Sequence, residues 1–369
     1  MADARALRRA ARPIAALCTV LALSGCETIA YYAQAAHGEL SLLSSAEPVQ
    51  TLLADPSTPA TLRAQLKAAE SIRDFASRVL KLPDNDTYRR YADLGRPYAV
   101  WNVVATPEFS LTALQSCFPV AGCVSYRGYF ARQAAEDYGA RLRARGDDVI
   151  VYGVPAYSTL GWFDDPLLST FIRYPETEVA HLLFHELTHQ LIYVKGDTTF
   201  DESLAEAVAA VGVRRWLAAT GRDAELASYL EARKRMREFA ALLAKTRSEL
   251  ERLYAEPIDA AQMRARKRAA LERLVQRYAA LKASWGGYTG YDRLFEGGPN
   301  NALLASFETY TKYVPAFERL LAQSGGDLQK FYARVRALAA LPRVERDREL
   351  EGLSLGEVPP SARSSRGPS

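Results

Sequence analysis

Three of the four histidines in the chain lie within nine residues, at positions 181, 185 and 189. The last two belong to the run His185-Glu186-Leu-Thr-His189. Histidines four residues apart stand on one face of a helix, about 6 Å apart along its axis, so both imidazoles can reach one Zn²⁺. Glu186 would project toward the open side of the metal, where it can take a proton from water. The spacing therefore predicts a hydrolytic zinc centre with two histidine ligands and Glu186 as general base.

Zinc requires at least one more protein ligand, and Glu202 is the candidate. It follows His189 by thirteen residues, across a turn that contains Gly196. A turn of this length would let a second helix, expected from Glu202 to Leu217, pack antiparallel against the first. Glu202 in its first turn would then face the histidines. Its carboxylate would complete a His₂Glu site that holds one zinc ion per chain and keeps one position open.

Three further residues are candidates for supporting roles. Glu206 lies one helical turn after Glu202 and is expected to hydrogen-bond a ligand imidazole, a role for which Asp201 competes. His181 is expected to pack against the site or support a ligand, because a third histidine together with Glu202 would close the metal shell. The alternative reading, in which the histidines are ordinary helix residues, has to explain why most of the histidine in the chain is concentrated here.

The histidine run must lie on a helix, and the sequence predicts one from Glu176 to Val194. Residues 222–284 have heptad spacing of apolar residues, with Pro257 and the candidate N-cap Asp259 in the middle, which predicts an antiparallel helical hairpin. The chain is therefore expected to be mainly helical, of the α+β class, with a small antiparallel or mixed sheet. The remaining expected elements are helices at 31–43, 61–80, 130–145 and 301–340, strands at 98–105 and 149–154, and a strand or turn at 122–130.

Composition excludes several classes of protein. The chain has 369 residues, of which 49% are apolar and 24% charged, which is ordinary for a globular protein and excludes a disordered chain or a small disulfide-stapled domain. The net charge is +4, but residues 1–25 carry four arginines against one aspartate. The remainder is nearly neutral, which argues against nucleic acid as a partner.

The N-terminus has the pattern of a signal peptide, with arginines at positions 8, 9 and 12 before an apolar stretch at 14–23. The following Leu23-Ser24-Gly25-Cys26 resembles the lipobox of bacterial lipoproteins. That resemblance implies cleavage before Cys26, acylation of this cysteine and attachment to the envelope membrane, facing the periplasm. Glu27 in place of an aspartate favours the outer membrane. An ordinary cleaved signal and an inner-membrane anchor are the alternatives. The tail at 357–369 is expected to be disordered.

Two cysteines remain after Cys18 leaves with the signal and Cys26 takes the lipid. Cys117 and Cys123 are separated by five residues. An exported protein meets an oxidising compartment, so these two are predicted to form a disulfide. Two free thiols in a turn are the alternative. A zinc site is disfavoured because nothing nearby supplies two further ligands.

The run at His185–His189 resembles the zinc peptidases, and among them the gluzincins, whose third ligand is a glutamate. Longer runs, Cys117–Cys123, Tyr157–Pro166 and Asn300-Asn301-Ala, resemble the bacterial predicted-aminopeptidase lipoproteins. The resemblance implies a zincin-like domain over residues 26–356 that removes N-terminal residues from peptides. A Gly-x-Met-Glu-Asn run, whose glutamate holds the substrate amine in well-known gluzincin aminopeptidases, does not occur in this sequence.

Substrate contacts are less well determined by the sequence. The strand at 149–154 could pair with the substrate backbone, as edge strands of zinc peptidases do. Asp164 and Asp165 could bind a substrate amine, although turn formation before Pro166 is the favoured role. The donor to the reaction's oxyanion would be one of three tyrosines, at 288, 291 or 310. An envelope endopeptidase and a non-catalytic, zinc-containing lipoprotein scaffold are the competing functions.

Overall fold

The computed structural model describes residues 31–118 and 122–356. The chain divides into two compact units at Ala46 and Glu47. In the first unit, residues 31–44 are helical, close to the predicted range. Cys18, Cys26, the signal peptide and the tail at 357–369 lie outside the described residues. Within the described ranges, no helix combines the length and apolarity that crossing a membrane requires.

The second unit is mainly helical and contains small mixed and antiparallel sheets, as the sequence predicted. Its strands are β1 (Glu47–Pro48), β2 (Arg90–Ala92), β3 (Val100–Thr106), β4 (Ser116–Phe118), β5 (Gly122–Val124), β6 (Arg127–Tyr129), β7 (Asp148–Val154) and β8 (Leu167–Leu168). Its helices are α2 (Val49–Ala54), α3 (Ala60–Arg78), α4 (Arg132–Ala144), α5 (Glu176–Leu191), α6 (Thr198–Ala219), α7 (Asp223–Tyr254), α8 (Ala260–Ser284), the 3₁₀ helix η1 (Asp292–Phe295), α9 (Asn301–Thr311), α10 (Val314–Gln323), α11 (Leu328–Ala339) and α12 (Arg343–Leu355).

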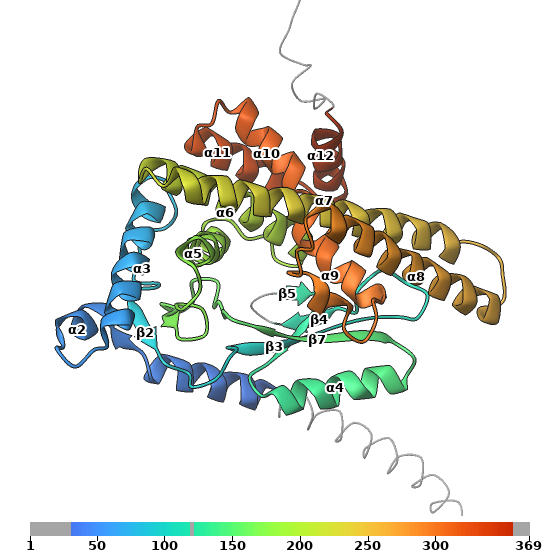
Figure 1. Cartoon of the computed structure of the whole chain (residues 1–369), viewed down its shortest axis with the longest axis horizontal. Helices are drawn as coiled ribbons and strands as arrows, with labels where there is room; N and C mark the ends of the chain where they lie inside the picture. Colours follow the sequence, from blue (N-terminus) through green and yellow to red (C-terminus); the bar gives the residue numbers. More distant parts are fainter. Residues whose placement is uncertain (1–30, 119–121, 357–369) are drawn as a thin grey trace, which may run out of the picture. The chain divides into compact units, whose positions relative to one another are not determined.

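The sheet β6-β3-β7 is antiparallel throughout, with β3 in the centre. Almost every residue of β3 is buried, because α4 packs on one face of the sheet and α9 on the other, below and above it in Figure 1. β7 pairs with β3 along its whole length, and no other described strand pairs with it. The predicted strand at 149–154 is therefore an edge strand.

Helices α5 and α6 form the closest helix pair of this unit. The apolar positions of α5, among them Leu183, Phe184 and Leu187, are fully buried. Gly212 of α6 faces Phe184 so closely that an added Cβ would lie 2.6 Å from the phenylalanine Cδ2 atom. Glycine is therefore required at this position, since any side chain would push the two helices apart.

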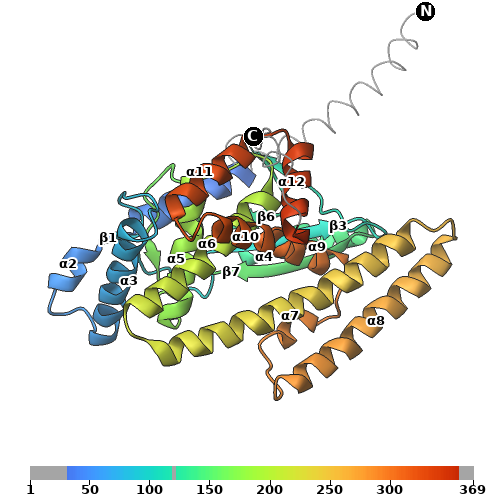
Figure 2. The ribbon, with the colours of Figure 1, turned by 90° about the horizontal axis from the view of Figure 1, so that it is seen from above.

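The predicted helical hairpin is confirmed as α7 and α8, which lie side by side (Figure 2). The side chain of Asp259 accepts hydrogen bonds from the backbone N–H groups of Ala261 and Gln262, each at 2.9 Å, so it is the N-cap expected from the sequence. Phe239, Leu250 and Leu274 are fully buried, with Phe239 edge-on to Tyr278. The heptad positions thus form the core of the hairpin.

The predicted continuous helical stretch at 301–340 is instead three helices, α9, α10 and α11. The first break precedes Pro315, whose ring cannot continue a helix and which lies in the first turn of α10. The second break is at Gly325 and Gly326, which adopt left-handed φ angles of 66° and 76°. The following helix, α12, was not anticipated from the sequence.

Helix α12 is fastened to the start of α6 by a buried ion pair. The Arg346 guanidinium donates two hydrogen bonds to Oδ2 of Asp197, at 3.0 and 2.6 Å, and both side chains are almost inaccessible to solvent. Asp197 also caps α6, because its other carboxylate oxygen accepts from the N–H of Phe200 at 3.2 Å. The pair therefore holds the first turn of the helix that carries Glu202.

We predict that Arg346→Met lowers the free energy of unfolding by about 3–5 kcal/mol, because it leaves the Asp197 carboxylate buried without its cation. The matched control is Arg343→Met in the same helix. Arg343 is exposed and lies 3.8 Å from Asp347, so its loss should cost only about 0–1 kcal/mol. Chemical denaturation of the variants measures both values, and equal losses would contradict the prediction.

Candidate metal centre

Helices α5 and α6 bring three donor atoms together. The Nε2 atoms of His185 and His189 are 3.2 Å apart, and Oε2 of Glu202 lies 3.0 Å from the first and 3.6 Å from the second. Tetrahedral zinc with bonds of about 2.0–2.1 Å separates its ligand atoms by about 3.3 Å. The three atoms are therefore spaced as zinc ligands are, and this group could hold a metal ion.

The position of Glu202 differs in detail from the sequence prediction. Helix α6 begins at Thr198 rather than at Glu202, because Asp197 caps it, so Glu202 lies in the second turn. Gly196 allows the preceding turn with a left-handed φ of 84°. Asp201 faces this turn, where its Oδ1 accepts the N–H of Val194 at 2.7 Å. It braces the connection between the helices, and no hydrogen bond joins it to an imidazole.

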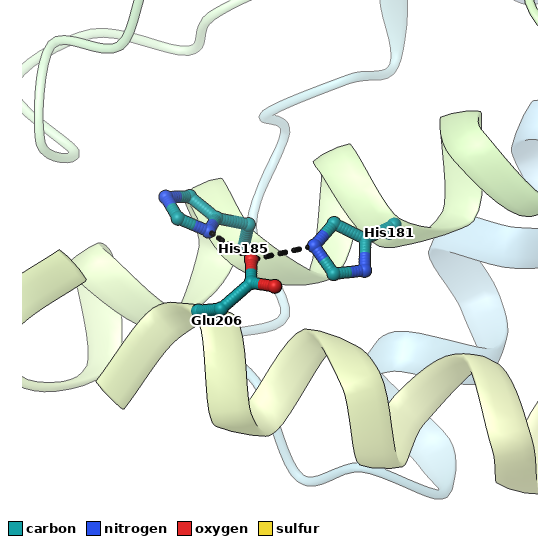
Figure 3. Close-up of side chains that lie close together, drawn as sticks. All are labelled: His181, His185 and Glu206. Carbon is teal, nitrogen blue, oxygen red and sulfur yellow. Dashed lines mark hydrogen bonds and ion pairs between the residues drawn. The ribbon is translucent and has the colours of Figure 1, made fainter. Parts of the chain in front are cut away.

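The hydrogen-bonded histidine partner of Glu206 is His181, which is not one of the predicted ligands. Its Oε2 lies 2.8 Å from Nε2 of His181 and 4.0 Å from Nδ1 of His185 (Figure 3). Its Oε1 accepts a hydrogen bond from Arg233 of α7. Nδ1 of His181 lies 3.2 Å from the hydroxyl of Tyr229, also in α7. Sequence analysis missed Arg233 and Tyr229, since nothing in the spacing of α7 distinguishes them from other polar hairpin residues.

His181, His185 and Glu206 form a second group that could hold a metal ion. The Arg233 guanidinium bonded to Glu206 makes this group the less suitable one, because it already neutralises the carboxylate and repels a second cation. Among the described residues, Glu202 forms ion pairs only with His185 and His189. We therefore take His185, His189 and Glu202 as the candidate metal centre, and we interpret Glu206 as a group that orients His185.

The charges of the candidate metal centre are strongly coupled. Burial would lower the pKa of His185, but the hydrogen bond and charge of Glu202, followed by the charges of Glu186 and Glu206, raise it to about 9. Burial would raise the pKa of Glu202, but His189 and His185 lower it to about 2. Without metal, His185 and Glu202 thus form a buried ion pair. A metal ion must displace the imidazole proton, since only the neutral ring is a ligand.

Glu186 is half-buried, one residue after His185 in α5. Its negative charge contributes to raising the pKa of three tyrosines, Tyr88, Tyr126 and Tyr310. In each case burial is the larger cause. The charge of Glu186 therefore reaches these three hydroxyl groups. Tyr88 and Tyr126 were not anticipated, because a chain with 20 tyrosines gives no signal that selects them.

Of the three tyrosines proposed from the sequence as oxyanion donors, only Tyr310 lies beside the candidate metal centre. Its ring centroid is 6.4 Å from that of His185, with the rings 28° from parallel. Burial and the charge of Glu202 hold its pKa well above the ordinary value, so its hydroxyl keeps the proton. Tyr291 instead stacks on Phe239 in the hairpin core, and Tyr288 lies against Arg235.

A contact between α6 and α9 positions Tyr310. Ser203, the residue after Glu202, is fully buried. Its Oγ donates a hydrogen bond to the carbonyl of Thr309 at 3.4 Å and accepts one from the N–H of Tyr313 at 3.2 Å. Because Tyr310 follows Thr309, this bond fixes its position relative to Glu202.

A cavity of about 1210 Å³ lies next to the candidate metal centre, lined there by Glu206, Tyr152 and Tyr310 but not by His185, His189 or Glu202. Its walls come from β7, α7 and α9 together with the loop before α9. Six consecutive residues, 147–152, line it. Since alternate side chains of a strand point to opposite faces, a continuous run means that the edge of β7 borders the cavity.

Two other sequence predictions concern the cysteine pair and the two aspartates before Pro166. Cys117 of β4 and Cys123 of β5 are joined by a disulfide with an S–S distance of 2.01 Å. Asp165 is buried and accepts the N–H of Thr159 at 2.9 Å, which is the turn-forming role. Burial raises the pKa of Asp165 to about 6, against the effect of this hydrogen bond. Asp164, by contrast, is exposed.

Comparison with known proteins agrees with the resemblance seen in the sequence. The model of a family described as "Putative aminopeptidase" matches residues 30–350, which is most of the chain. No significant match was found among curated proteins or among solved structures.

We predict that His185→Ala, His189→Ala and Glu202→Ala each sharply reduce the zinc bound per chain, because each removes one donor atom of the candidate metal centre. His181→Ala and Glu206→Ala should weaken zinc binding by only about 10–100-fold, as expected for groups that orient ligands. Elemental analysis and competition with a chelator give the two readouts. Loss of zinc in Glu206→Ala with retention in Glu202→Ala would place the metal in the other group.

Proposed function

Because the chain belongs to the aminopeptidase family whose model matches residues 30–350, we propose that it is a zinc-dependent peptidase that removes N-terminal residues from peptides. The observation that carries this proposal is the convergence of His185, His189 and Glu202 on one point, with Glu186 beside them. These donors fit zinc in type and spacing, and a carboxylate next to a His₂Glu group is the arrangement of metal-assisted peptide hydrolysis.

Zn²⁺ held by these three residues would polarise the scissile carbonyl and acidify the attacking water. Glu186 accepts the proton from that water and delivers it to the leaving amine. Glu206 lies 4.0 Å from the opposite nitrogen of His185 and is itself held by bonds to His181 and Arg233. The chain thus contributes a base and a fixed ligand geometry.

Tyr310 is the proposed donor to the oxyanion. It keeps its proton at neutral pH because burial and the charge of Glu202 raise the pKa of its hydroxyl. It also lines the cavity that the substrate would enter. A donor placed in advance on a rigid helix stabilises the developing negative charge without having to reorganise.

The edge of β7 is the proposed track for the substrate backbone. It borders the cavity, and Tyr152 of this strand lies close enough to Glu202 for the glutamate charge to raise the tyrosine pKa, after the larger effect of burial. An extended peptide could add to this edge as a further antiparallel strand. β7 runs from the cavity at Asp148 to Val154. The carboxyl part of the peptide would therefore lie in the cavity and its amino end beyond Val154.

The proposed setting is the bacterial envelope, with the chain anchored through lipid on Cys26 and the outer membrane favoured over the inner one. The disulfide between Cys117 and Cys123 supports an oxidising compartment such as the periplasm. Separation of cell membranes from soluble proteins tests this setting, and a chain found only in the soluble fraction would contradict it.

The main test of the proposed reaction is Glu186→Gln. The amide keeps the size of the side chain but cannot accept a proton, so turnover should fall by about 10²–10⁴-fold. Glu186 is not one of the proposed ligands, so zinc should remain near one ion per chain. Turnover of short peptides and elemental analysis measure both effects, and unchanged turnover would remove Glu186 from the mechanism.

The same assay separates the competing functions when each peptide is supplied with a free and an N-acetylated amino end. An aminopeptidase cleaves only the free peptides, whereas an envelope endopeptidase cleaves both. A zinc-containing scaffold binds metal but cleaves neither, and this result would overturn the proposed reaction.

We also predict that Tyr310→Phe lowers kcat by about 10²–10³-fold, because it removes one hydrogen bond to the oxyanion. KM and bound zinc should change little. Tyr291→Phe is the matched control and should leave kcat unchanged, since this partly buried tyrosine stacks on Phe239 in the hairpin. Steady-state kinetics compare the two, and equal effects would contradict the assignment.

A further inference from the structure

The loop at 158–166 carries two neighbouring aromatic side chains that the fold leaves in water. Trp162 is 68% exposed and Phe163 is 52% exposed, more than any other aromatic residue of the described chain. Removing a large apolar side chain from water is favourable. Two adjacent aromatic residues in solvent are therefore an apolar surface without a partner in the described chain.

This loop is held in one conformation by its own hydrogen bonds. Oγ1 of Thr159 donates to the carbonyl of Phe163 at 3.2 Å and accepts its N–H at 3.0 Å. The N–H of Trp162 donates to the carbonyl of Thr159 at 3.1 Å. Leu160 adopts a left-handed φ of 56°, which is unfavourable for a residue with a side chain. The exposure of the two aromatic residues thus results from an ordered turn.

The loop lies beside the candidate metal centre. Gly161 packs against Gln190, the residue after the ligand His189, so that an added Cβ would be 3.4 Å from the glutamine Cγ. At the base of the loop, the carbonyl of Asp165 accepts the N–H of Tyr88 at 2.7 Å. Trp162 and Phe163 are therefore presented next to the end of α5 that carries His189.

The order of β7 and the loop along the chain sets the direction in which a bound peptide would approach Trp162 and Phe163. β7 borders the cavity at residues 147–152, ends at Val154 and leads within a few residues into the loop. All strand pairs in its sheet are antiparallel, so an added peptide strand would continue that pattern. Its carboxyl part would then lie in the cavity and its amino end would point toward Trp162 and Phe163.

We propose that Trp162 and Phe163 receive the side chain on the amino side of the scissile bond and select peptides whose first residue is large and apolar. This inference rests on the proposed peptidase function. A lipid surface is the other partner that exposed aromatic residues can serve, but the packing of the loop on Gln190 beside a metal ligand favours the substrate.

The test compares three tripeptides, Phe-Ala-Ala, Ala-Phe-Ala and Ala-Ala-Ala, with the zinc-loaded protein. The wild type should prefer Phe-Ala-Ala. The double substitution Trp162→Ala and Phe163→Ala should reduce the ratio of kcat/KM for Phe-Ala-Ala over Ala-Ala-Ala by at least about tenfold, mainly through KM. The matched control is Tyr174→Ala. Tyr174 is 40% exposed and precedes α5 at its opposite end, so its loss should leave the ratio unchanged.

A binding measurement separates failure of this inference from failure of the proposed function. In the Glu186→Gln protein, Phe-Ala-Ala should bind more weakly once Trp162 and Phe163 are replaced, whether or not the wild type cleaves it. An unchanged affinity would overturn the inference. So would a preference for phenylalanine at the second position that the double variant abolishes, because the substrate would then run in the opposite direction.

Sedimentation with vesicles of phosphatidylethanolamine and phosphatidylglycerol tests whether the two aromatic residues bind a lipid surface instead. The wild type and the double variant should sediment equally with them. Loss of vesicle binding in the double variant, with an unchanged preference among the three tripeptides, would overturn the inference in favour of a lipid surface.

Discussion

The close antiparallel packing of α5 on α6 is the constraint on which the rest of the site depends. The candidate ligands come from both helices, and their donor atoms are 3.0–3.6 Å apart. A shift of one helix by an ångström would separate them. The packing is set by Gly212 against Phe184 at one position and by the Asp197 cap at the start of α6. Arg346 of α12 secures that cap from 149 residues further along the chain, so α12 supports the helix that carries Glu202.

The same packing explains how charged groups can be buried in this region. Burying an unpaired carboxylate or imidazolium in the interior would lower the free energy of unfolding, because the charge loses its contact with water. Here each buried carboxylate has close nitrogen partners: Glu202 faces His185 and His189, while Glu206 faces His181 and Arg233. The result is a row of charges along the α5–α6 interface in which Arg233 extends the network into α7. The long hairpin is thus bonded directly to Glu206, which lies beside the candidate metal centre.

The sheet and α9 contribute two features that α5 and α6 do not provide. β7 supplies an edge that borders the cavity, and α9 brings Tyr310 to the ring of His185. On the other side, the loop after β7 presents Trp162 and Phe163 beside Gln190. In the proposed function, one continuous segment from β7 to Pro166 would therefore contact the substrate on both sides of the scissile bond.

The sequence alone determined the features that follow from local periodicity. Histidines at i and i+4 must share a helix face, and heptad apolar residues with a capped break must form a helical hairpin, so both predictions needed no distant contact. The prediction of a continuous helix at 301–340 was wrong because it followed the apolar spacing alone. Pro315 and two glycines with left-handed φ angles interrupt the helix. Tertiary structure decided which of the three candidate tyrosines lies beside His185, the pairing of Glu206 with His181 and Arg233, and the exposure of Trp162 and Phe163. These features depend on how helices and loops far apart in the chain pack together. The spacing of residues within one helix or strand does not determine that packing.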